Sequence, residues 1–399
     1  MKVLLIFGSA AIFIGGLYAQ QRVELLPSPT APGSAEPNLT VAPDGRVYLS
    51  WLEPSETGHA LRFAILSGTT WSAPRTIRAG TDFFVNWADF PSLKVLGRDQ
   101  LAAHWLQRTG SSTYAYGVRV AISRDGGKSW SAAITPHRDT SNTEHGFVTL
   151  WREQRGFSAA WLDGRKFIAD AHNPANEMMV LTTTFNPDGT LSAETMLDAR
   201  ACDCCQTAVA LTSAGPIIAY RDRSPDEVRD IYVTRRVAGK WTRGAAVHND
   251  NWVIPACPVN GPAIAASGTR VAVAWFTAAR DEPRVKISFS TDAGASFGKA
   301  IAIDSGNPAG RVDIAMLSDG SALVSWIERT GGDTAAVQVR RVRANGRAGP
   351  TRTVALSSAA RASGFPRMVI SGQHALFAWT AVGKPSTVRV ARLPLTRLR

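Results

Sequence analysis

The sequence predicts an all-β protein, and specifically a β-propeller of seven four-stranded blades. The first observation is a repeat: an alternating apolar run ends in an aromatic residue at intervals of 54, 56, 59, 55, 51 and 53 residues. These aromatic residues are Trp51, Trp105, Trp161, Tyr220, Trp275, Trp326 and Trp379. The second is that apolar residues alternate with period 2 in each unit, as in strands. The third is that no long helical periodicity follows the N-terminal segment.

One unit shows the expected elements in order. Residues 314–326 read IAMLSDGSALVSW, which predicts a hairpin with its turn at Gly320. A third strand is expected at 337–343, a turn at Asn345-Gly346 and a fourth strand at 351–356. The aromatic residue that recurs once per unit is then expected to pack in the core of each blade.

The last unit shows only three clear strands, at 366–370, 375–380 and 387–393. Residues 21–26 precede the first unit and are predicted to supply the missing fourth strand. Such closure joins the two ends of the ring and leaves no open sheet edge. Six blades are the alternative, if one unit is a satellite of the ring.

The N-terminus predicts a secretory signal peptide over residues 1–19, followed by a single domain over 20–399. Met1-Lys2 is followed by an apolar run at 3–17 and by Ala19 before a polar start. The alternative is a membrane anchor, although the run is shorter than the ~20 residues that a spanning helix needs. We therefore expect a secreted or periplasmic protein that makes no membrane contact once the signal is cleaved.

Two segments share the pattern Ser-x-Asp-x-Gly-x-x-aromatic: residues 123–130 read SRDGGKSW and residues 290–297 read STDAGASF. Both are expected between the third and fourth strands of their units. A short Asp side chain accepts backbone N–H groups in a turn, and Gly provides the positive φ that the turn requires. We refer to these segments as the two Ser-Asp-Gly turns.

The pattern resembles the Asp-box of the bacterial neuraminidase repeat, and the chain as a whole resembles the sialidase-like β-propeller family. This resemblance implies that the box is structural and lies away from the active site. It also implies an arginine triad for a substrate carboxylate, a Tyr–Glu nucleophile pair and an Asp acid/base. The corresponding activity is that of a glycoside hydrolase that acts on an acidic sugar and needs no cofactor.

Polar residues at the loops nearest the propeller axis supply the candidates for this chemistry. Arg165, Arg223 and Arg280 follow the recurring aromatic residue in three consecutive units, so we assign them as candidate anion binders. Asp89 is the candidate acid/base and Glu227 a supporting carboxylate. The alternative interpretation is that these charges form ion pairs that lock neighbouring loops.

The four cysteines form the sharpest local signal. Cys202, Cys204 and Cys205 lie in one loop, and both Cys202 and Cys257 stand 18 residues before the aromatic residue of their units. The repeat therefore predicts that the two segments are close. Three interpretations compete: disulfides, which suit an exported protein; thiolates that bind copper or zinc, with His145 or His248 as a further ligand; and a redox-active or free set of thiols.

The net charge of +12 comes from 44 Lys+Arg against 32 Asp+Glu. Much of the arginine is dispersed along strands, as at 340–343, which indicates a solvated face and no nucleic-acid partner. The sequence thus favours an exported sialidase-like glycoside hydrolase whose partner is an acidic glycan or another small anionic ligand. The alternative is a non-hydrolytic propeller that binds a ligand or metal at the cysteines.

Overall fold

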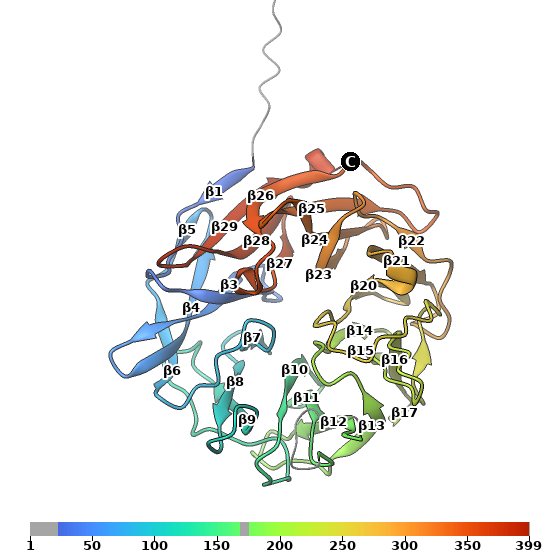
Figure 1. Cartoon of the computed structure of the whole chain (residues 1–399). Helices are drawn as coiled ribbons and strands as arrows, with labels where there is room; N and C mark the ends of the chain where they lie inside the picture. The colour runs from blue at the N-terminus through green and yellow to red at the C-terminus, as the bar shows by residue number, and fades with distance from the viewer. Residues whose placement is uncertain (1–22, 168–174, 399) are drawn as a thin grey trace, which may run out of the picture.

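The computed structural model describes residues 23–167 and 175–398, and the predicted signal peptide lies outside them. Seven antiparallel sheets are arranged in a ring around a central axis (Figure 1), which confirms the seven-bladed propeller and excludes six blades. In the described ranges, no helix has the length and apolar character needed to cross a membrane.

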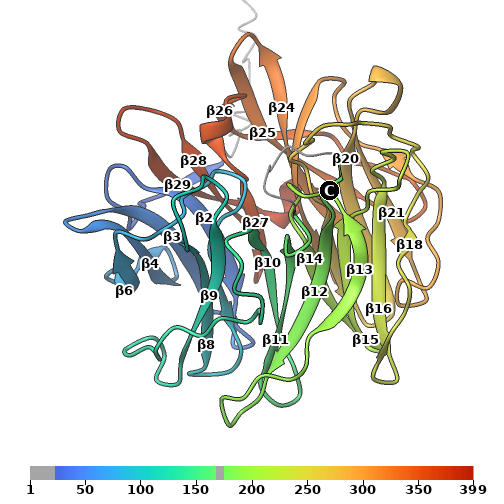
Figure 2. The same cartoon turned by 60° about the horizontal axis from the view of Figure 1, so that its bottom comes forward.

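The blades follow one another along the chain. The first contains β2 (Ala35–Val41), β3 (Val47–Ser55), β4 (Gly58–Ser67), β5 (Thr70–Trp71) and β6 (Arg75–Gly80). The second contains β7 (Ser92–Val95), β8 (Leu101–Arg108) and β9 (Tyr116–Ser123), with its fourth strand reduced to the bridge Val120–Ile134. The third contains β10 (His145–Arg152), β11 (Phe157–Asp163), β12 (Met178–Phe185) and β13 (Thr195–Ala201). Figure 2 shows the second and third blades from the side.

The remaining blades repeat this order. The fourth contains β14 (Ala208–Thr212), β15 (Gly215–Arg221), β16 (Ile231–Val237), β17 (Lys240–Trp241) and β18 (Ala245–Ala246). The fifth contains β19 (Ala263–Ser267), β20 (Arg270–Thr277), β21 (Arg284–Ser290) and β22 (Ile301–Ala302), with the 3-10 turn η1 (Ala279–Asp281) between its second and third strands. The sixth contains β23 (Pro308–Met316), β24 (Ala322–Gly331), β25 (Thr334–Val342) and β26 (Arg352–Ser358), followed by η2 (Arg361–Ser363).

The last blade joins the two ends of the chain, as predicted. It contains β27 (Arg367–Ser371), β28 (His374–Ala381) and β29 (Thr387–Pro394), before η3 (Leu395–Leu398). The N-terminal strand β1 (Glu24–Leu26) pairs antiparallel with β29, and the two lie side by side in Figure 1. The hydrogen bonds of this pair join the two ends of the chain within one blade and so close the ring.

The recurring aromatic residues are buried in the blades, as predicted for core residues. The indole N–H of Trp51 donates to Glu53 at 2.6 Å, that of Trp161 to Asp163 at 2.8 Å, and that of Trp326 to Glu328 at 2.6 Å. Each carboxylate stands two residues after its tryptophan and faces inward to meet it. These three acidic residues near the rim therefore satisfy buried indoles.

The two Ser-Asp-Gly turns connect the third and fourth strands of the second and fifth blades. In the first, an Asp125 carboxylate oxygen accepts the backbone N–H groups of Lys128 and Ser129 at 3.0 Å each, and the Ser129 hydroxyl donates to its other oxygen at 2.6 Å. Asp292 accepts the N–H and hydroxyl of Ser296 at 2.9 and 2.6 Å. Both turns lie at the outer part of the ring, which agrees with a structural role.

Candidate functional site

Two connected hollows mark the propeller axis. The inner strands line a narrow channel of about 160 Å³, and a cavity of about 450 Å³ opens at one mouth of it. Ala88 and Phe147 line both, so the two spaces meet at these residues. The cavity is formed by loops that lead into inner strands and loops that follow second strands. We call it the mouth cavity.

A buried acidic chain runs from the channel to the mouth cavity. The Tyr116 hydroxyl lies 3.1 Å from an oxygen of Asp89, which lines the channel, and 2.5 Å from an oxygen of Glu144, which lines the mouth cavity. A hydroxyl has one proton, so it cannot donate fully to both carboxyl groups at once. Both contacts are satisfied together when one carboxyl group is protonated and donates to the Tyr116 oxygen.

A bulge in β10 positions this chain. Phe147 has φ of 53°, and the strand register shifts between Gly146 and Thr149. The bulge turns the Phe147 N–H toward Asp89, to which it donates at 2.7 Å. Gly146 is required here because a Cβ would lie 1.9 Å from an Asp89 carboxylate oxygen.

Burial dominates the titration of both acids. It raises the pKa of Glu144 to about 8 and that of Asp89 to about 7, although hydrogen bonds from Tyr116 and from the Phe147 N–H partly oppose the shift. The charges of Asp89 and Asp203 raise the pKa of Glu144 further. Near neutral pH the hydrogen-bonded chain of Asp89, Tyr116 and Glu144 thus offers a protonated carboxyl group to the mouth cavity. A protonated carboxyl group at such a place has the property of a general acid.

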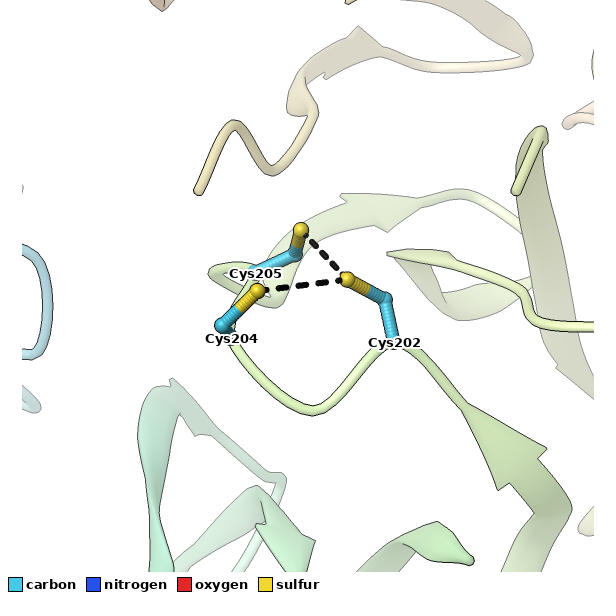
Figure 3. Close-up of side chains that lie close together, drawn as sticks. All are labelled: Cys202, Cys204 and Cys205. Atoms are coloured by element: carbon cyan, nitrogen blue, oxygen red, sulfur yellow. Dashed lines mark hydrogen bonds between the residues drawn. The ribbon is translucent and has the colours of Figure 1, made fainter. Parts of the chain in front are cut away.

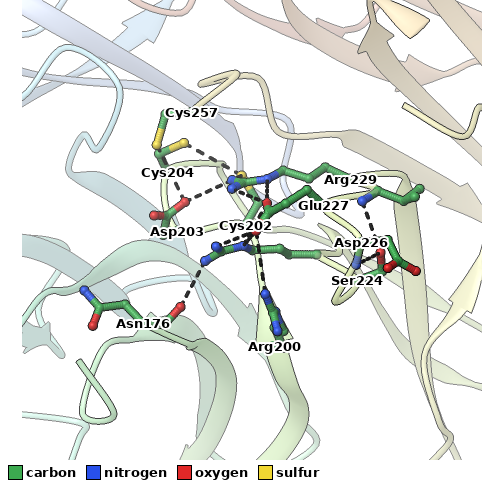
Figure 4. A network of polar contacts seen from close by, with 12 residues as sticks. Asn176, Arg200, Cys202, Asp203, Cys204, Ser224, Asp226, Glu227, Arg229 and Cys257 are labelled. Atoms are coloured by element: carbon green, nitrogen blue, oxygen red, sulfur yellow. Dashed lines mark hydrogen bonds and ion pairs between the residues drawn. The ribbon is translucent and has the colours of Figure 1, made fainter. Parts of the chain in front are cut away.

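A second, fully ion-paired network forms another wall of the mouth cavity (Figure 4). Glu227 receives Arg223 at 2.6 Å and Arg229 at 2.9 Å, and Arg200 approaches to 3.6 Å. Partial burial raises the pKa of Glu227, but the hydrogen bonds from Arg223 and Arg229 outweigh it and hold the pKa below the usual range. Glu227 and Arg223, which the sequence assigned to the site, do lie together at the cavity, and each is occupied by the other.

The guanidinium group that is free to meet a ligand belongs to Arg361 in η2. It lines the mouth cavity, and within the described part of the chain it donates no hydrogen bond and forms no ion pair. Tyr114, whose side chain is 37% exposed, and the half-buried Trp87 line the same space. The Trp87 ring already packs against Phe365 and Arg311. Tyr114 and Arg361 are therefore an aromatic group and a cation of the kind that bind an acidic sugar.

The other two predicted anion binders lie elsewhere. Arg165 is held by Asp163 at 2.7 Å and by Glu194 at 3.0 Å, and it does not line the mouth cavity. Arg280 is exposed in η1 with φ of 59°, and it does not line the cavity either. The three arginines therefore do not converge on one cavity wall, because Arg165 turns back to the acid two residues before it.

The three loop cysteines converge, as Figure 3 shows. The Cys202 sulfur lies 2.7 Å from that of Cys205 and 3.7 Å from that of Cys204, and none of the three is in a disulfide. Cys257 joins Cys204 and Asp203 in an adjacent group, which confirms that the two cysteine segments are close. His145 stacks on His137, and His248 pairs with Asp250, so neither histidine belongs to the sulfur cluster.

Sequence reasoning missed three of the groups that matter here. The sequence pattern assigned no role to Glu144, Tyr116 or Arg361. Tyr116 begins β9 and reads as an ordinary strand aromatic, while Arg361 sits in the linker between two blades. The glycine at 146 before a bulky Phe is the signal that could have indicated a bulge beside Glu144.

Comparison with known proteins places the fold. No protein-family model and no curated protein sequence matches the chain. An ulvan lyase bound to a saccharide of glucuronic acid and rhamnose sulfate superposes with a TM-score of 0.55 at 11% identity, over 94% of this chain and 97% of the other. The α-L-arabinofuranosidase of Fusarium graminearum with arabinobiose gives 0.52 at 13% identity, over 94% and 98%. The NanB sialidase from Streptococcus pneumoniae aligns more loosely, at 0.43 and 12% identity over 93% and 70%. The first two similarities show that the chain shares their propeller fold.

Proposed function

We propose that the protein is a carbohydrate-active enzyme that cleaves an acidic glycan in the mouth cavity, as a glycoside hydrolase of the sialidase-like kind. The observation that carries the proposal is the acidic chain of Asp89, Tyr116 and Glu144 that ends in this cavity. The solved structures of similar fold include proteins named as an arabinofuranosidase and an ulvan lyase, which supports the same broad class.

Glu144 is the proposed catalytic acid, because it is the member of the chain that lines the cavity. A protonated carboxyl group next to a glycosidic oxygen gives its proton to the leaving group as the bond breaks. Asp89 and Tyr116 lie behind it and are positioning residues that orient its carboxyl group and hold its proton. This assignment moves the acid role from Asp89, where sequence reasoning placed it, to its hydrogen-bonded neighbour.

The anionic part of the substrate is proposed to bind at Arg361. Arg223 and Arg229 share Glu227, so their charges are largely neutralised, whereas Arg361 is open to the cavity. The third arginine of the wall, Arg200, is shared between Glu227 at 3.6 Å and Glu177 at 3.9 Å. A carboxylate or sulfate on a sugar is therefore favoured at Arg361.

The test is the release of reducing ends from a panel of sialosides, uronic-acid glycosides and sulfated oligosaccharides. Glu144→Gln should lower kcat about 10²–10⁴-fold. Arg361→Ala should raise KM about tenfold, a loss of about 1.4 kcal/mol of binding. Arg280→Ala is the matched control, since Arg280 is an exposed arginine outside the cavity, and it should leave both constants unchanged.

The Asp89→Asn variant distinguishes a positioning role of Asp89 from a purely structural one. It should shift the pH profile of kcat, because the neighbour that shares the proton is changed, whereas a purely structural role would leave that profile unmoved. The absence of turnover across the whole panel would overturn the proposed function. So would a Glu144→Gln variant that keeps full activity.

A further inference from the structure

We infer that Cys202, Cys204 and Cys205 form a binding site for a soft, thiolate-preferring metal ion, and that Cu(I) is the ion that fits this donor set. The three sulfurs lie within 4.8 Å of one another and point toward a common centre (Figure 3). Thiolates select Cu(I) among the soft metal ions. This inference is independent of the proposed glycan cleavage.

One of the sulfur separations already matches that of two thiolates on a shared ion. Two thiolates on one metal at about 2.3 Å stand about 3.8 Å apart, and the Cys202 and Cys204 sulfurs are at 3.7 Å. The Cys202 and Cys205 sulfurs are at 2.7 Å, so Cys205 must move about 1 Å away from Cys202 to complete a three-sulfur set. Metal binding then releases the thiol protons to solvent.

The surroundings of the sulfurs stabilise negative charge. Arg229 donates to the Cys202 sulfur at 3.5 Å. The guanidinium charge lies next to the sulfur cluster and would offset the negative charge of metal-bound thiolates.

The surroundings of Arg221 also favour a negative charge at the sulfur cluster. Arg221 is 1% exposed, and its guanidinium donates only to the backbone carbonyls of Arg229, Asn260 and Phe276, at 2.6–3.0 Å. Among the residues that the structure describes, it forms no salt bridge. A buried guanidinium is costly unless an anion lies near. Asp230 interacts electrostatically with Arg221, and a metal-bound thiolate at Cys205 would add a second negative charge beside it.

The number of ligand atoms at the site favours Cu(I) over Zn(II). A structural zinc site takes four ligands, but no histidine or carboxylate of the described residues completes the sulfur triad. Asp203 is already engaged by Arg229 at 3.1 Å, and Cys257 groups with Asp203 and Cys204 to one side. Three thiolates suffice for Cu(I). Cys204 lines the mouth cavity, so the ion has a path from solvent.

The experiment starts with thiol counting on the protein as isolated, followed by anaerobic titration of the reduced full chain with Cu(I) against bicinchoninate. We expect four thiols after denaturation in chelator and one Cu(I) withheld per chain. Cys204→Ser is preferred over the fully buried cysteines because Cys204 is half-buried and its loss is least harmful to folding. It should weaken Cu(I) retention at least about tenfold.

Cys257→Ser is the matched control, because it removes an exposed thiol outside the triad. It should retain Cu(I) like the parent chain, and circular dichroism of both variants should match the parent. Three results would overturn the inference: two disulfides in the isolated protein, no Cu(I) withheld from the chelator, or equal losses in the two variants. Stoichiometric Zn(II) binding without Cu(I) retention would also overturn it.

Discussion

Carboxylates at the outer turns and carboxylates at the channel mouth titrate in opposite directions. Asp125 in the outer turn is exposed and accepts two backbone N–H groups and two hydroxyls, so hydrogen bonding holds its pKa well below the usual range. Glu144 at the mouth is buried among other acids, and burial raises its pKa to about 8. The same chemical group is thus a fixed acceptor in one place and a proton donor in the other.

The difference shows how a propeller separates stability from chemistry. The outer turns repeat with the blades and satisfy each polar atom locally. The mouth combines residues from different blades: Asp89 precedes the second, Tyr116 begins its third strand and Glu144 precedes the third blade. Titratable groups whose burial lowers the stability of the fold are concentrated at the axis, where a ligand can interact with them.

The largest expected effect is on the pH dependence of stability. A carboxyl group whose pKa is raised on folding favours the folded state at low pH, and it destabilises that state as pH rises above the unfolded value near 4.3. Up to about 1.4 kcal/mol per pH unit is lost per group until the folded pKa, about 8 for Glu144, is passed. Glu144→Gln should therefore gain stability over the parent protein as pH rises from 5 to 8, in urea unfolding at each pH.

The groups that face Glu144 are Tyr116, Asp89, Asp203 and Cys202, and Asp89 titrates together with it. Asp89→Asn should flatten the same slope below about pH 7. Parallel curves for Glu144→Gln and the parent protein would contradict the assignment of a raised pKa.

The next effect tests the space around the acidic chain. Gly146→Ala places a Cβ 1.9 Å from Asp89 and 2.9 Å from the Tyr116 ring. We expect a loss of about 2 kcal/mol in the free energy of unfolding, because a side chain must move out of a packed site. Gly298→Ala is the control, since its Cβ would meet nothing closer than 3.6 Å, and it should cost far less. Equal stability of the two variants would contradict the tight packing at the mouth.

The smallest effect belongs to the outer turns. Asp125→Asn keeps an acceptor for the backbone but loses the one for the Ser129 hydroxyl. We expect a fall of at most about 2 °C in the thermal midpoint. Because the pKa of Asp125 is depressed, its contribution is present above pH 4 and lost in acid, so the difference should vanish at low pH. A loss of stability as large as that of Gly146→Ala would contradict the contrast between the outer turns and the channel mouth.

The sequence predicted the repeating parts of the molecule because local rules decide them. Period-2 alternation gives strands, and the aromatic residue at the end of each run gives a blade core. The equivalent positions of Cys202 and Cys257 in adjacent units placed the cysteine segments together, as the structure confirms. The closing strand was expected at 21–26, and β1 pairs with β29 at 24–26.

The sequence by itself determined the ring, its seven units, its closure and the clustering of four cysteines, since each follows from periodicity along one chain. The tertiary structure alone decided which charges are free. Arg223 and Arg165 are occupied by nearby acids, whereas Arg361 is open to the mouth cavity. It also decided that Glu144 holds a proton, because burial and the contact with Tyr116 arise only when separate blades meet at the axis.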